Sequence, residues 1–183
     1  MNYYHVDFHA VTKGNDFQAI NRFVERYQSV VQNSKFNHWN VTQPSEKGHP
    51  VLVQTMKQNG VIRTNCVDCL DRTNAWMTKI AFLSLCDMLD SSGLEKGMNR
   101  VPLSAVDQKT ENKSEFIWKF KNIWADNGDN ISISYTGTGA TTSSTTRHGK
   151  GGIGATFDHK FKSISRFYLA NVEDVYKEKA LGA

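Results

Sequence analysis

Two residues in the first half of the chain, Cys66 and Arg72, have the types and the spacing that phosphate-ester chemistry needs. A cysteine thiolate is a nucleophile that can attack phosphorus. An arginine guanidinium can hold two phosphate oxygens in a bidentate fork. Because five residues separate the two side chains, one tight loop can bring both onto a single phosphate group. The pair therefore predicts the phosphate-binding loop of a cysteine-dependent phosphatase.

The other residues of this loop are expected to act through their backbone and hydroxyl groups. Successive N–H groups at Val67, Cys69 and Leu70 can converge on phosphate oxygens and form an anion-binding nest. A helix that begins after the loop points its positive pole at the same place and favours a thiolate at Cys66. Thr73 can donate a hydrogen bond to that thiolate or assist hydrolysis of a phosphocysteine intermediate.

Two carboxylates, Asp68 and Asp71, also belong to the loop. A carboxylate repels an anionic substrate, so its presence is understandable only if it carries a proton at the right moment. A general acid must protonate the leaving alkoxide, and the same residue can later activate water. We favour Asp68 for this role, because Asp71 directly precedes Arg72 and can orient it instead.

The elements around the loop can be predicted from hydrophobic periodicity and turn signals. A strand at 61–64 is expected to lead into the loop, and a buried helix from 72 or 73 to about 89 to lead out of it. The remaining predicted strands are 3–8, 51–56 and 131–135, the helices are 15–32, 115–125 and 158–179, and the loops are 33–50, 91–113 and 136–154. This order favours an α/β fold, a mixed β-sheet flanked by helices.

Composition limits the classes of protein to which the chain can belong. Its 183 residues correspond to one domain or a large piece of one. With 39% hydrophobic residues and a net charge of +4, it is expected to be globular and not nucleic-acid-binding. Three cysteines do not suit a secreted disulfide framework, and no apolar run reaches the roughly 20 residues of a membrane span. A cytoplasmic location is therefore expected.

Several chemically active residues also have simpler interpretations. Cys66 and Cys69 form a C-x-x-C pair, but a zinc site needs about two more ligands, and no second pair exists. Cys86 is expected in the core. Arg147 and Lys150 are either solvated charges or contacts to lipid headgroups, and the sequence does not separate the two.

The stretch from Arg63 to Asn74 resembles the signature of Sac-domain phosphoinositide phosphatases nearly letter for letter. Other segments are similar to further parts of that family, so the resemblance spans almost the whole chain; they are 4–9, 124–129, 134–140, 146–150 and 165–169. One departure is Thr141-Thr142, where the family usually has Leu-Lys. If that lysine contacts a second ring phosphate, Arg147, Lys150 or Lys162 can replace it.

The resemblance implies a magnesium-independent enzyme, without metal or cofactor, that removes phosphate from the inositol ring of membrane phosphoinositides. It implies Cys66 as nucleophile and Arg72 as the phosphate-binding arginine. It further implies that residues 1–183 are the C-terminal catalytic part of a Sac domain, whose N-terminal subdomain would be a partner. The expected location is peripheral, at the anionic cytosolic surface of endomembranes.

Two other functions stay open at this point. A non-catalytic module could use the loop only to bind phosphoinositides, although binding alone does not need both Cys66 and Arg72. A protein tyrosine or dual-specificity phosphatase uses the same loop chemistry, but the residues flanking Cys66 favour the lipid phosphatases.

Overall fold

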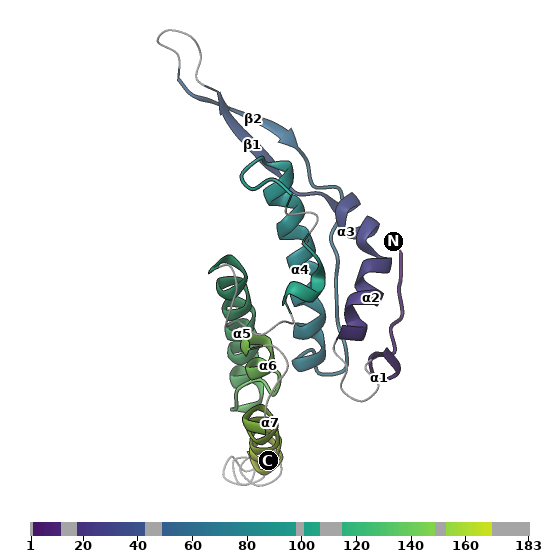
Figure 1. Ribbon diagram of the computed structural model, residues 1–183, viewed down its shortest axis with the longest axis vertical. Coiled ribbons are helices and arrows are strands. Elements are labelled where there is room, and N and C mark those ends of the chain that lie inside the picture. The colour runs from purple at the N-terminus through teal and green to yellow at the C-terminus, as the bar shows by residue number, and fades with distance from the viewer. Residues whose placement is uncertain are drawn as a thin grey trace, which may run out of the picture.

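The helix that follows the Cys66–Arg72 loop, α4 (Asp71–Ser91), is the centre of the fold. The computed structural model describes residues 2–11, 18–42, 49–97, 101–106, 115–148 and 153–169. In Figure 1, α4 lies between the helices α2 (Gln18–Arg26) and α3 (Gln28–Ser34) on one side and α5 (Glu115–Thr136) on the other. The prediction of a buried helix after the loop is confirmed.

The hydrophobic core forms where these helices meet. It comprises buried residues from α2, α4, α5 and the short 3₁₀ helix η3 (Leu103–Val106), namely Ile20, Val24, Phe82, Cys86, Leu103, Val106 and Phe120. The rings of Phe82 and Phe120 pack edge to face, with centroids 5.3 Å apart. Cys86 is a core residue, as predicted, and burial raises the pKa of its thiol to about 11.

The β-structure of the described residues is a single antiparallel hairpin. Strand β1 (His38–Thr42) pairs with β2 (Val51–Met56), and Asn40 lies opposite Val53. Figure 1 shows the hairpin extending away from the helices at one end of the molecule. The strand predicted at 51–56 is confirmed, whereas the loop predicted over 33–50 is wrong where β1 forms. The described residues thus combine α and β structure, but with a two-stranded antiparallel sheet rather than the predicted mixed sheet flanked by helices.

Three predicted strands do not form. Residues 2–7 carry no strand, and Asp7 instead accepts a hydrogen bond of 3.0 Å from the Ala10 N–H at the start of α1 (Phe8–Val11). Residues 61–64 carry no strand, so the loop does not follow a strand directly. Residues 131–135 belong to α5, which continues past its predicted end to Thr136.

Gly128 lies inside α5, at a point where this helix approaches α4 closely. This glycine was interpreted as a helix stop, but it lies within α5, where the helix packs against α4. A Cβ atom there would lie 2.7 Å from Asn74 Nδ2. The glycine therefore permits close helix packing. Asn74 uses this approach to donate a 3.0 Å hydrogen bond to the Trp124 carbonyl and to accept one of 2.9 Å from the Asn127 amide.

The remaining helical predictions hold in outline. The helix expected at 15–32 is interrupted at Tyr27, which separates α2 from α3. The loop expected over 136–154 contains α6 (Ser143–His148), and the last helix, α7 (Ile153–Tyr168), begins before its predicted start. Its predicted extension to residue 179 lies outside the described residues. Within the described part of the chain, every helix falls short of the length and apolarity that a bilayer crossing requires.

Candidate active site

The sulfur of Cys66 lies in the loop at the beginning of α4 and accepts two hydrogen bonds. The Thr73 hydroxyl donates to Cys66 Sγ at 3.1 Å, and the Cys69 N–H donates at 3.3 Å. Cys69 has a φ of +56°, the left-handed conformation in which its N–H can turn back to the sulfur. Thr73 projects from the first turn of α4 and is buried. Both donors point at the sulfur, the atom through which a cysteine acts as a nucleophile.

The carboxylate of Asp68 is hydrogen-bonded to the sulfur of Cys66. Its Oδ1 accepts a hydrogen bond of 3.3 Å from the Cys66 thiol and one of 3.2 Å from the Leu70 N–H. Its Oδ2 lies 3.8 Å from an Arg72 guanidinium nitrogen. Both side chains are partly exposed, so this ion pair contributes little stability. Asp68 thus lies beside Cys66, and Arg72 lies beside Asp68.

Asp71 faces a different part of the molecule. Its Oδ2 accepts a 2.8 Å hydrogen bond from Arg166 of α7, and its Oδ1 accepts one of 3.2 Å from the Thr142 N–H. Both members of the Asp71–Arg166 pair are less than one fifth exposed. Burial acts to raise the pKa of Asp71, but the hydrogen bond and charge of Arg166, together with hydrogen bonds from Thr141 and Thr142, outweigh it and hold the pKa below its ordinary value. Asp71 is therefore an ionised carboxylate whose two oxygens accept hydrogen bonds from Arg166 and Thr142.

The other predicted loop residues have separate surroundings. The side chain of Val67 is exposed, that of Leu70 is buried, and Cys69 is exposed and free of a disulfide. The thiol of Cys69 donates to the Cys66 carbonyl at 3.3 Å and accepts from the Cys66 N–H at 3.3 Å. This reciprocal pair closes the loop on itself. Cys69 is therefore held within the loop by hydrogen bonds, although its side chain is exposed.

Arg147 is engaged with α5. Its guanidinium donates to Asp126 and, at 3.0 Å, to Asp129. The hydrogen bond to Asp126, with the further contributions of Asp129, raises the pKa of Arg147. Two carboxylates thus already surround this predicted headgroup contact. Lys150, the other predicted contact, lies outside the described residues.

Sequence reasoning did not assign a role to Arg166 or Thr142, although both touch Asp71. The only available signal for Arg166 was its place in a segment, 165–169, that resembles the family. Neither periodicity nor spacing could identify it, because 95 positions separate it from Asp71.

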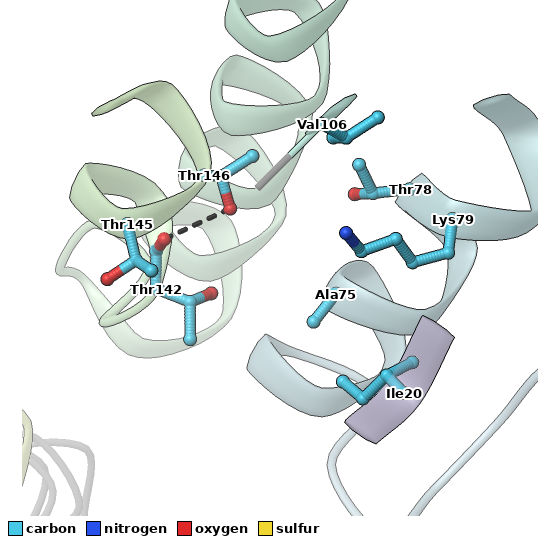
Figure 2. A pocket seen from close by; sticks show the side chains of 8 residues that line it. All are labelled: Ile20, Ala75, Thr78, Lys79, Val106, Thr142, Thr145 and Thr146. Atoms are coloured by element: carbon cyan, nitrogen blue, oxygen red, sulfur yellow. Dashed lines mark hydrogen bonds between the residues drawn. The ribbon is translucent and has the colours of Figure 1, made fainter. Parts of the chain in front are cut away.

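A small cavity of about 50 Å³ lies along α4, beyond its first residues. It is lined by residues of α2, α4, η3 and the segment that includes α6, namely Ile20, Ala75, Thr78, Lys79, Val106, Thr142, Thr145 and Thr146. Figure 2 shows the Lys79 ammonium pointing into it, while the Thr146 hydroxyl donates to the Thr142 carbonyl. Neither Cys66 nor Arg72 lines this cavity. It is therefore not the place where a phosphate would meet the sulfur.

The site is a loop at the beginning of a helix, with a hydrogen-bonded cysteine and, at the first turn of the helix, an arginine paired with Asp68. Comparison with curated proteins shows which proteins the chain resembles. Over 99% of its length the chain is 28% identical to phosphoinositide phosphatase SAC6 of Arabidopsis thaliana and 31% identical to phosphatidylinositol-3-phosphatase SAC1 of Drosophila melanogaster. Over 94% of its length it is 30% identical to polyphosphatidylinositol phosphatase INP53 of Saccharomyces cerevisiae.

The chain spans 28% of SAC6, 28% of the Drosophila protein and 14% of INP53. No protein-family model matches the chain, and no solved structure matches it. The resemblance inferred from the loop is nevertheless confirmed along almost the whole sequence: the chain is a relative of the Sac-domain phosphoinositide phosphatases.

Proposed function

We propose that this chain is part of a phosphoinositide phosphatase and hydrolyses inositol-ring phosphomonoesters through a phosphocysteine intermediate. The single observation that carries the proposal is the pair of donors, Thr73 and the Cys69 N–H, on the sulfur of Cys66. A binding loop has no need to stabilise charge on a sulfur, whereas a nucleophilic loop does. The similarity to named phosphoinositide phosphatases supports the substrate class.

In the first step, the Cys66 thiolate attacks the phosphorus of a ring phosphate. A sulfur–phosphorus bond forms as the bond from phosphorus to the inositol oxygen breaks, and protonated Asp68 gives its proton to that oxygen. Arg72 holds the non-bridging oxygens as they gain charge. The proposal is supported by the 3.3 Å between Asp68 and the sulfur and by the proximity of Arg72 to Asp68.

In the second step, water attacks the phosphocysteine and Asp68 accepts a proton from it. The sulfur–phosphorus bond breaks, inorganic phosphate leaves and the thiolate is restored. The Thr73 hydroxyl, 3.1 Å from the sulfur, would stabilise the thiolate as a leaving group. No proton needs to pass through Asp71, whose lowered pKa suits a permanently ionised group and not a general acid.

For substrate binding, we propose that the N–H groups of Val67, Cys69 and Leu70 surround the phosphate. Those of Cys69 and Leu70 now donate to Cys66 and Asp68, and they would turn to phosphate oxygens when the substrate enters. Arg147 and Lys150 are proposed contacts to the headgroup or the anionic bilayer, each worth about 1 kcal/mol there. For Arg147 this requires sharing its guanidinium with Asp126 and Asp129.

At the level of the whole protein, we propose that residues 1–183 supply the loop-bearing, C-terminal part of a Sac catalytic domain. The proposed setting is the cytosolic side of endomembranes, where phosphoinositide headgroups are accessible. The N-terminal part of such a domain would then be its structural partner. The chain spans 28% of SAC6 and of the Drosophila SAC1, which supports its being one part of a longer protein, and the C-terminal placement rests on the resemblance of the loop and its flanking segments.

The direct test is phosphate release by the full chain from a panel of soluble phosphoinositides with different ring positions. Cys66→Ser should abolish release and leave binding to phosphoinositide vesicles close to that of the unmodified chain. A Cys66→Ser variant that turns over normally would exclude the phosphocysteine mechanism. Vesicle binding without release by the unmodified chain would indicate a binding module. Release from a phosphotyrosine peptide alone would indicate a protein phosphatase.

A further inference from the structure

The guanidinium of Arg166 joins α7 to three other parts of the molecule, namely α4, α5 and the segment 138–139. It donates to Asp71 Oδ2 at 2.8 Å on the first residue of α4 and to Ser132 Oγ at 2.7 Å on α5. It also donates to the Gly139 carbonyl at 3.2 Å and the Thr138 hydroxyl at 3.3 Å. Ser132 is fully buried and Arg166 itself is 19% exposed. These contacts satisfy most of the donors that a guanidinium offers.

The position of Asp71 gives this cluster a relation to the chemistry. Asp71 is the first residue of α4 and is covalently followed by Arg72, the proposed phosphate-binding arginine. It also follows Leu70, whose carbonyl accepts the Asn74 N–H at 3.0 Å in the first turn of the helix. A contact that holds the Asp71 side chain therefore also restrains the backbone at the end of the loop, next to Arg72.

Neighbouring contacts show that the restraint on Asp71 comes from outside its own helix. The second oxygen of its carboxylate is held by the N–H and the hydroxyl of Thr142, at 3.2 Å and 3.4 Å. Asp68 and Arg72 pair with each other on the sulfur side of the loop. The charged groups of this region thus form two sets, one facing the sulfur and one facing α7.

We propose that Arg166 is a positioning residue, which holds Asp71 so that Arg72 and the loop keep the orientation needed to bind and transfer phosphate. The inference rests on the proposed function. It assigns α7, a helix far from the loop in sequence, to the support of the site. Arg166 touches neither the substrate nor Cys66; it acts through Asp71.

The alternative is that Arg166 only stabilises the fold, and a cycle of variants separates the two. The full chain would be prepared with Asp71→Asn, with Arg166→Gln and with both changes, and kcat and KM would be measured on a soluble phosphoinositide. Misplacing a site by about 1 Å can cost on the order of a hundredfold in rate. We expect each single change to lower kcat by roughly ten- to a hundredfold. The double variant should be no slower than the worse single variant.

A second measurement tests phosphate binding at the loop without depending on turnover. The rate at which iodoacetamide alkylates Cys66 would be followed by peptide mass spectrometry, with and without inorganic phosphate. Phosphate should protect Cys66 in the unmodified chain, and Arg166→Gln should weaken that protection at least tenfold. Lys160→Gln removes the same charge from an exposed position of the same helix and should leave both readouts unchanged.

Losses that multiply in the double variant, or full protection of Cys66 by phosphate in Arg166→Gln, would overturn the inference. If melting curves show that Arg166→Gln does not fold, Arg166→Lys takes its place in the same cycle and is judged by the same criteria. If the unmodified chain releases no phosphate from any phosphoinositide, the proposed function fails. In that case only the protection of Cys66 by inorganic phosphate tests the role of Arg166.

Discussion

The hydroxyl of Thr73 donates a hydrogen bond of 3.1 Å to the sulfur of Cys66. Thr73 is on the first turn of α4 and is buried, so its side chain is held in place by the helix that follows the loop. The sulfur thus receives a fixed donor from the helix and a second donor from the loop backbone. Loss of the Thr73 hydroxyl should therefore remove one of the two donors to the sulfur.

Thr73→Ala should slow turnover by roughly ten- to a hundredfold, because a hydrogen bond to a charged group contributes about 1.5–3 kcal/mol. Thr73→Ser keeps the hydroxyl and should retain most of the activity. The measurement is kcat on a soluble phosphoinositide for both variants. Equal loss in the alanine and serine variants would show that the methyl group, and not the hydroxyl, matters.

Asp68→Asn should lower kcat by about a hundredfold or more, because it removes the proposed general acid. The loss should be smaller on a substrate with an activated leaving group, such as p-nitrophenyl phosphate, which needs no protonation. Asp71→Asn should not show this dependence on the leaving group, since Asp71 is held as an anion by Arg166. If Asp71→Asn shows the dependence and Asp68→Asn does not, the roles of the two carboxylates are reversed.

The stability of the chain should depend on pH through Asp71. Its folded-state pKa is lowered below the ordinary value of 3.8, so the ionised form contributes stability that is present above pH 3.8. That contribution is lost as the pH falls through the folded-state pKa. The difference in free energy of unfolding between the unmodified chain and Asp71→Asn should therefore be constant near pH 5–7 and shrink below pH 3.8. Urea denaturation across this range measures it, and a difference independent of pH would contradict the assignment.

Gly128→Ala should destabilise the fold, although alanine favours a helix by about 1 kcal/mol over glycine. The new Cβ would lie 2.7 Å from Asn74 Nδ2, so the Asn74 side chain must move and its bonds to α5 weaken. We expect a net loss of about 1–3 kcal/mol in the free energy of unfolding. Asn130→Ala, at an exposed position of the same helix, is the matched control and should have little effect. An increase in stability for Gly128→Ala would show that α4 and α5 do not pack this closely.

The helices were the most predictable part of the fold. The pattern of apolar residues that begins near Trp76 identified α4, and burial of Cys86 followed from its place on that helix. The strands were less predictable. The alternation from Ile131 to Tyr135 suits a strand, yet it is also compatible with a helix in which Ser132 faces inward and donors from α7 reach it.

The proposed chemistry of the loop could be predicted from the sequence because the residues that would carry it are close together in the chain. Cys66, Asp68, Arg72 and Thr73 lie within one short stretch, and the start of a helix brings them together whatever surrounds it. Only the tertiary structure decided what happens to Asp71. Its partner Arg166 is 95 positions away, and the packing of α7 against the segment 138–143 brings the two charges to 2.8 Å. The sequence by itself thus predicted the proposed reacting groups, while long-range packing separated Asp68, which lies beside the sulfur, from Asp71, which pairs with Arg166.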